Sequence, residues 1–162
     1  MAYVKSRLVL GTSFMPENNG PEKRSARYVI KVTIVGPDDS MLYQVLEAIA
    51  DKSVTVDGIR IGSRDLKGRD LEVQAVVMLP TRHAMDILVS LTFKGASAAI
   101  VVLESPDPEL ESKHRNEIRE NVGHVPTRVF YVGSELDKEK KRELLSLFHD
   151  LVNEVMATRA GE

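Results

Sequence analysis

Two adjacent carboxylates and a hydroxyl follow the most strand-like stretch of the chain, and they are its leading candidates for chemistry. Residues 29–35 are almost all β-branched or long apolar side chains, which predicts a strand buried on both faces. A glycine and a proline end this strand. Oxygen ligands suit Mg²⁺, and open α/β sheets bind ligands beyond the carboxyl ends of their strands. The sequence therefore predicts a candidate site at Gly36, Asp38, Asp39 and Ser40, with Asp38 and Asp39 as metal ligands.

The same side chains have a purely structural interpretation. Asp and Ser are preferred N-cap residues, because their side-chain oxygens accept hydrogen bonds from the free N–H groups of a helix. Asp39 or Ser40 would cap the helix that follows the first strand. Asp137 stands just before a long apolar-striped segment and would cap that helix in the same way. Both interpretations stay open at this point.

The elements that position these residues follow from hydrophobic periodicity. Alternation of strands and helices predicts a three-layer α/β domain whose central sheet is mostly parallel. Residues 67–70 link two strand-like runs through a glycine, which predicts one antiparallel hairpin edge, and residues 51–57 are predicted to be a polar connection. The predicted strands are 29–35, 59–66, 71–79, 97–103 and 127–132, and the predicted helices are about 41–50, 83–93, 106–122 and 138–157.

Domain organisation is simple, because 162 residues suffice for one domain with a substantial core. Residues 1–27 are predicted to be an N-terminal arm, in which 3–10 has the pattern of an edge strand and 11–27 that of a linker. Residues 28–157 form the predicted α/β domain, and 158–162 a short tail.

Composition excludes several classes of function. The chain has no cysteine, so disulfides, thiolate metal sites and a cysteine nucleophile are ruled out. A formal charge of -2 gives no basic field for nucleic acid, and no apolar run is long enough to cross a membrane. We expect a cytoplasmic protein that binds neither nucleic acid nor a membrane.

The four histidines give little sign of a metal site, since none has a partner at metal-ligand spacing. His114 and His149 lie on predicted helices and are expected at the surface. His83 follows a strand end, where an acid–base role is conceivable.

Three segments carry a resemblance to a known family. Residues 32–36 are similar to the strand that leads into a phosphate loop, residues 93–108 to the segment after the second switch, and residues 125–137 to the segment with the guanine-reading Asn-Lys-x-Asp motif. Together with the hairpin between the first two helices, the chain resembles Ras-like small GTPases, a P-loop and Rossmann-like group. The resemblance implies a nucleotide site at the residues named above together with Ser134 and Asp137. The chain departs from the family in lacking a clear sixth strand after its last helix, unless residues 3–10 fill that edge of the sheet.

The nucleotide-binding motifs of that family are degraded here. The second glycine and the lysine of the phosphate loop are absent, and Pro37 removes a backbone donor. Asp38 and Asp39 would each repel a phosphate charge at 4 Å by roughly 4 kcal/mol. In the base-reading motif Ser134 replaces the asparagine and Glu135 the lysine. The family's Asp-x-x-Gly motif, which senses the γ-phosphate, would fall at residues 78–82, and these contain neither Asp nor Gly.

The expected function is therefore that of a pseudo-GTPase. We expect a non-catalytic regulatory or assembly subunit that acts through a protein partner or a homodimer, with no cofactor and no GTP hydrolysis. The alternative is a Mg-dependent nucleotide- or phosphate-binding regulator that uses residues 36–40, through weak GTP binding or as a switch similar to a receiver domain. An enzyme of another type, with Asp38, Asp39 or His83 in its cleft, is a third hypothesis.

Overall fold

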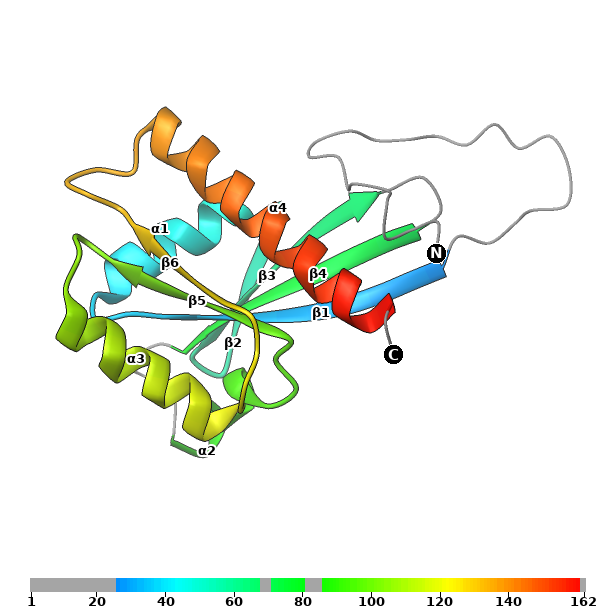
Figure 1. Ribbon diagram of the computed structural model, residues 1–162, viewed down its shortest axis with the longest axis horizontal. Helices are drawn as coiled ribbons and strands as arrows, with labels where there is room; N and C mark the ends of the chain where they lie inside the picture. The colour runs from blue at the N-terminus through cyan, green and yellow to red at the C-terminus, as the bar shows by residue number, and fades with distance from the viewer. Residues whose placement is uncertain (1–25, 68–70, 81–85, 161–162) are drawn as a thin grey trace, which may run out of the picture.

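The computed structural model describes residues 26–67, 71–80 and 86–160. The predicted arm at 3–10, most of its linker, the hairpin turn at 68–70 and His83 lie outside these residues. Within the described part, an α/β fold contains a six-stranded mixed sheet and four helices (Figure 1). The elements are β1 (Ala26–Val35), α1 (Asp39–Ile49), β2 (Lys52–Val56), β3 (Ile59–Lys67), β4 (Leu71–Pro80), α2 (Asp86–Phe93), β5 (Ala98–Leu103), α3 (Pro108–Asn121), β6 (Thr127–Tyr131) and α4 (Lys138–Ala160).

The sheet has the order β2-β3-β4-β1-β5-β6. β1 pairs in parallel with β4 and β5, and β5 pairs in parallel with β6. β3 is antiparallel to both of its neighbours, so it alone of the six runs against the others. The predicted β-branched strand is therefore central, and its mostly apolar sequence follows from burial of residues 32–35 on both faces of the sheet.

Helices cover the two faces of the sheet, α1 with α4 on one side and α2 with α3 on the other (Figure 1). Side chains alternate along β1, so Ile30, Val32 and Ile34 pack toward α1 and α4. Val35 joins the smaller cluster on the opposite side with Phe93. The predicted three-layer arrangement is confirmed.

Two polar side chains of β1 hold the end of α2 against the sheet. Lys31 Nζ donates to the backbone oxygen of Lys94 at 2.5 Å and also to that of Leu91. The Thr33 hydroxyl, which is fully buried, donates to the Thr92 oxygen at 2.5 Å. These bonds satisfy carbonyls at the helix C-terminus, and partial burial lowers the pKa of Lys31.

The prediction of a polar connection at residues 51–57 is wrong. β2 occupies most of it and pairs antiparallel with β3. β2 is an edge strand with four of its five residues exposed, so its short Val54-Thr55-Val56 alternation is not accompanied by the burial of a half-covered strand. The Asp57-Gly58 pair, with φ of 51° and 82°, makes the tight turn, and this Asp-Gly dipeptide is the signal that the sequence offered.

The predicted hairpin of residues 59–66 and 71–79 is confirmed as β3 and β4, although it lies inside the sheet rather than at its edge. Charged residues on β3 therefore do not protect an edge. Arg60 instead stacks over the Tyr43 ring at 4.0 Å, and Arg64 donates to the Ile49 oxygen at 3.0 Å. Both arginines tie the hairpin to α1.

The last helix extends to Ala160, three residues beyond its predicted end at 157. The Arg159 guanidinium explains the extension, because it donates to the Val29 oxygen at 3.1 Å and to the Ser97 hydroxyl at 3.0 Å. The final turn of α4 is thus fixed to the starts of two strands.

Candidate functional site

The loop between β1 and α1 is closely packed at Gly36. A Cβ atom at this position would lie 2.4 Å from the Val102 backbone oxygen and 3.0 Å from Leu42 Cδ2. The glycine is therefore required by the close approach of β5, a role different from the backbone cradle that glycines supply in a phosphate loop.

Asp38 caps α1, one residue before the predicted position. Its Oδ1 accepts a hydrogen bond from the Met41 N–H at 3.1 Å, and its backbone is extended, as an N-cap requires. Asp39 lies in the first turn and Ser40 is exposed. An N-cap carboxylate at the start of α1 is confirmed, but the residue is Asp38, so the assignment of the cap to Asp39 or Ser40 is wrong.

The second predicted pair, Ser134 and Asp137, precedes α4. Asp137 Oδ1 accepts from the Lys140 N–H at 2.8 Å, so this residue is the N-cap that the sequence allowed. Ser134 and Glu135 are exposed. Because β1 and β6 both flank β5 in parallel, their two loops lie at the same end of the sheet, roughly 10 Å apart.

The structure thus brings the candidate residues to one end of the sheet, but it does not gather their carboxylates into one cluster. Across the described ranges, no group of three or more His, Asp or Glu side chains is placed to hold a metal ion. Asp38 and Asp137 each use one carboxylate oxygen on their own helix. Residues 78–82 are the segment in which the γ-phosphate-sensing motif was sought. Met78 lies half-buried on β4, and residues 81 and 82 are outside the described part.

His114 was expected at the surface, and this is wrong. Its side chain is only 7% exposed and lies on the inner side of α3, one turn before the buried Ile118. Both ring nitrogens are buried without a hydrogen-bond partner in the described residues, and the closest carboxylate, that of Glu117, is 3.9 Å from Nδ1. Burial lowers the pKa of His114, while the Glu117 charge acts in the opposite direction. His149 is half-buried rather than fully exposed.

We expect His114 to make the fold sensitive to acid. Its pKa is lowered in the folded state, so as pH falls below about 6.5 the unfolded chain binds the proton first and the free energy of unfolding decreases. One proton contributes at most about 1.4 kcal/mol per pH unit. Urea unfolding of wild type and His114→Leu between pH 7.5 and 5 should show the variant gaining relative stability as pH falls.

A second variant checks the cause. Glu117→Gln removes the charge that raises the His114 pKa, so it should steepen the acid loss. If the stabilities of wild type and His114→Leu kept a constant difference over this range, the buried imidazole would not be the titrating group.

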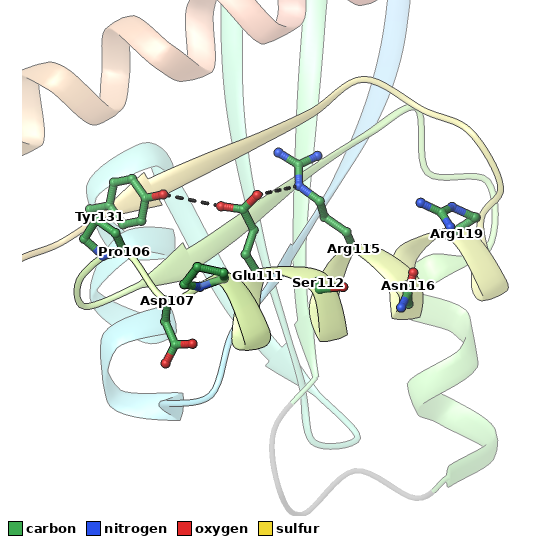
Figure 2. A pocket seen from close by; sticks show the side chains of 9 residues that line it. Pro106, Asp107, Glu111, Ser112, Arg115, Asn116, Arg119 and Tyr131 are labelled. Carbon is green, nitrogen blue, oxygen red and sulfur yellow. Dashed lines mark hydrogen bonds and ion pairs between the residues drawn. The ribbon is translucent and has the colours of Figure 1, made fainter.

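A hollow lies elsewhere, along the outer flank of α3 beside β6. It has a volume of about 380 Å³ and is lined mostly by polar side chains (Figure 2). Glu111 stands at its centre, where its carboxylate accepts from Arg115 Nε at 3.1 Å and from the Tyr131 hydroxyl at 3.4 Å. We call this hollow the α3–β6 groove. Sequence reasoning missed it, because helix α3 shows only a solvated polar face.

Comparison with protein-family models and with curated proteins found no match. Among the described residues, no helix combines the length and the apolar content needed to cross a membrane.

Proposed function

We propose that this chain is a non-catalytic Ras-like domain that serves as a regulatory or assembly subunit through protein–protein contacts. The observation that carries the proposal is the loop after β1. In place of a phosphate cradle it is a helix-capping turn, with Gly36 against the Val102 backbone oxygen and the Asp38 carboxylate on the Met41 N–H.

The arrangement of the sheet supports the Ras-like part of the proposal. The β3–β4 hairpin lies between α1 and α2, and β4 then pairs with the central β1. The remaining strands, β5 and β6, follow in parallel on the other side of β1. This order agrees with the layout that the sequence resemblance implies except at β2, which adds a sixth strand where none was expected. The degraded motifs at residues 36–40 and 134–137 lie in the loops that would hold the nucleotide.

An apolar surface near the β2 edge supports the protein-contact part. Val54 and Val56 of β2 are 59% and 50% exposed. Val54 lies opposite Ile61, Ile61 opposite Met78, and Met78 opposite Thr33, whose hydroxyl bonds to α2. Since paired residues share a face, all of these side chains lie on the α2 side of the sheet, where Thr33 is buried beneath α2 and Val54 and Val56, nearer the edge, are exposed.

Calorimetric titration with GTP, GDP and ATP in the presence of Mg²⁺ tests the first half of the proposal. We expect no binding up to millimolar nucleotide, because the loop lacks a lysine and its backbone is packed against β5. Micromolar binding of any of these nucleotides would overturn the proposal in favour of the Mg-dependent nucleotide-binding regulator.

Substitutions on β2 test the second half. The double variant Val54→Lys with Val56→Lys should weaken self-association, or stoichiometric co-purification with a partner, by at least roughly tenfold, because lysine ammonium groups resist burial in an apolar contact. Thr55→Lys is the matched control, since it is exposed on the same strand but on the opposite face. Equal effects of both variants would contradict the assignment of this surface.

A further inference from the structure

The free edge of β6 is a second surface of this protein, remote from the β2 edge. Among the described residues β6 pairs with β5 alone, so it ends the sheet. The Val132 N–H donates to Leu103 and the Pro126 oxygen accepts from Ala99, which shows that even-numbered residues turn their backbone groups toward β5. Thr127, Val129 and Tyr131 therefore direct theirs outward.

Two of these outward carbonyls are already contacted by side chains. The Tyr131 oxygen accepts from Lys140 Nζ at 3.2 Å, and the Thr127 oxygen accepts a long bond from Arg128 Nη1 at 3.4 Å. The N–H and C=O of Val129, midway along the edge, have no hydrogen-bond partner in the described part of the chain. An added strand would pair here and end before Tyr131.

The α3–β6 groove runs beside this edge and has opposite charges at its two ends. Asp107 and Glu111 stand toward the start of α3, where Asp107 Oδ1 accepts from the Leu110 N–H at 3.2 Å and Glu111 binds Arg115 and Tyr131. Arg115 and Arg119 come from the later turns of the same flank (Figure 2). Arg119 is exposed, and its guanidinium has no partner among the described residues.

The spacing of the two arginines matches an extended chain. Residues four apart on a helix are separated by about 6 Å along its axis, and alternate side chains of a strand by about 6.7 Å. A strand placed on the β6 edge sends every second side chain to the α3 side of the sheet, where Val129 and Tyr131 also lie. Two of those side chains would stand opposite Arg115 and Arg119.

We propose that the β6 edge and the α3–β6 groove bind an extended peptide segment of a partner protein that carries acidic residues at alternating positions. Backbone hydrogen bonds to Val129 supply the pairing, and the carboxylates pair with Arg115 and Arg119. Asp107, beyond Glu111 at the start of α3, sets the register of the bound segment, because a third carboxylate there would be repelled. This inference concerns a different surface from the β2 edge and does not depend on the proposed function.

The probe is a blocked seven-residue peptide of valine and threonine with glutamate at two alternating positions. Its binding to the full chain is followed by ¹H–¹⁵N correlation spectra. We expect shifts at the amides of Thr127, Val129 and Tyr131 and at the Nε groups of Arg115 and Arg119. A peptide with glutamine in place of glutamate should bind roughly tenfold more weakly, and N-methylation of its pairing backbone nitrogens should abolish binding.

Variants of the chain test the arginines. Arg119→Gln should weaken binding of the glutamate peptide roughly tenfold, whereas Arg142→Gln, an exposed arginine on α4, should not change it. Arg119→Glu should shift the preference toward a lysine peptide. Absence of binding at millimolar peptide, shifts confined to β2, or equal affinity for the glutamate and glutamine peptides would each overturn the proposal.

Discussion

Gly36→Ala is expected to destabilise the fold by about 3 kcal/mol, at the upper end of the range for overpacking in a well-packed site. The new methyl group would lie 2.4 Å from the Val102 backbone oxygen, and a backbone atom of a central strand cannot move aside as a flexible side chain does. The strain would separate β1 from β5 or displace Leu42, which is buried in the main core. For a domain of this size the melting temperature should fall by about 10 °C.

The control for this variant is Ser40→Ala, which changes an exposed side chain of the same segment and should alter stability by under about 0.5 kcal/mol. The two variants separate the two interpretations of the loop. A phosphate cradle would be open at the glycine, so Gly36→Ala would then leave the unliganded protein nearly as stable as wild type and affect only nucleotide binding. That result would contradict the packing described here.

Phe148→Ala should cost about 4 kcal/mol of unfolding free energy, because it removes a large, fully buried aromatic side chain and leaves a cavity. Phe148 lies in the core cluster between α4 and the sheet, together with Phe130, Leu144 and Leu151. The midpoint of urea unfolding is the measurement, with the slope of the transition checked for two-state behaviour.

Ser146→Ala provides the matched control on the same helix. Ser146 is exposed, and alanine has the higher helix propensity, so this variant should be neutral or slightly stabilising. If Phe148→Ala cost less than 1 kcal/mol, α4 would not be an integral layer of the domain. A large cost would show that the last helix folds cooperatively with the sheet.

Elements whose burial is continuous or regularly periodic were predictable from the sequence. The β-branched run that forms β1 indicated its own burial, because a strand covered on both faces lacks regular polar alternation. The apolar stripe of α4 likewise predicted its inward face, and Leu144, Phe148 and Leu151 are fully buried. Such patterns depend on neighbours two, three or four residues apart, which the sequence displays directly.

Elements at the margins of the fold were harder to predict. β2 has exposed residues on both faces and pairs only with β3. The sequence indicates it only through the short Val54-Thr55-Val56 alternation and the Asp57-Gly58 turn. His114 lies on a helix with mostly charged residues, and its burial comes from the packing of α3 against β5. In both cases the deciding contacts are with residues distant in the chain.

The sequence by itself determined the α/β class, the central strand, the hairpin and the absence of a phosphate-loop motif after residue 36. Only the tertiary structure decided what the remaining loop residues do. Gly36 is explained by a carbonyl of β5, and Asp38 and Asp137 by the N–H groups of their helices. The α3–β6 groove was equally invisible, since Arg115 and Arg119 share its lining with Tyr131 of β6 only once α3 is packed on the sheet. Local patterns record periodicity, whereas a site is formed by side chains that the fold brings together from separate segments.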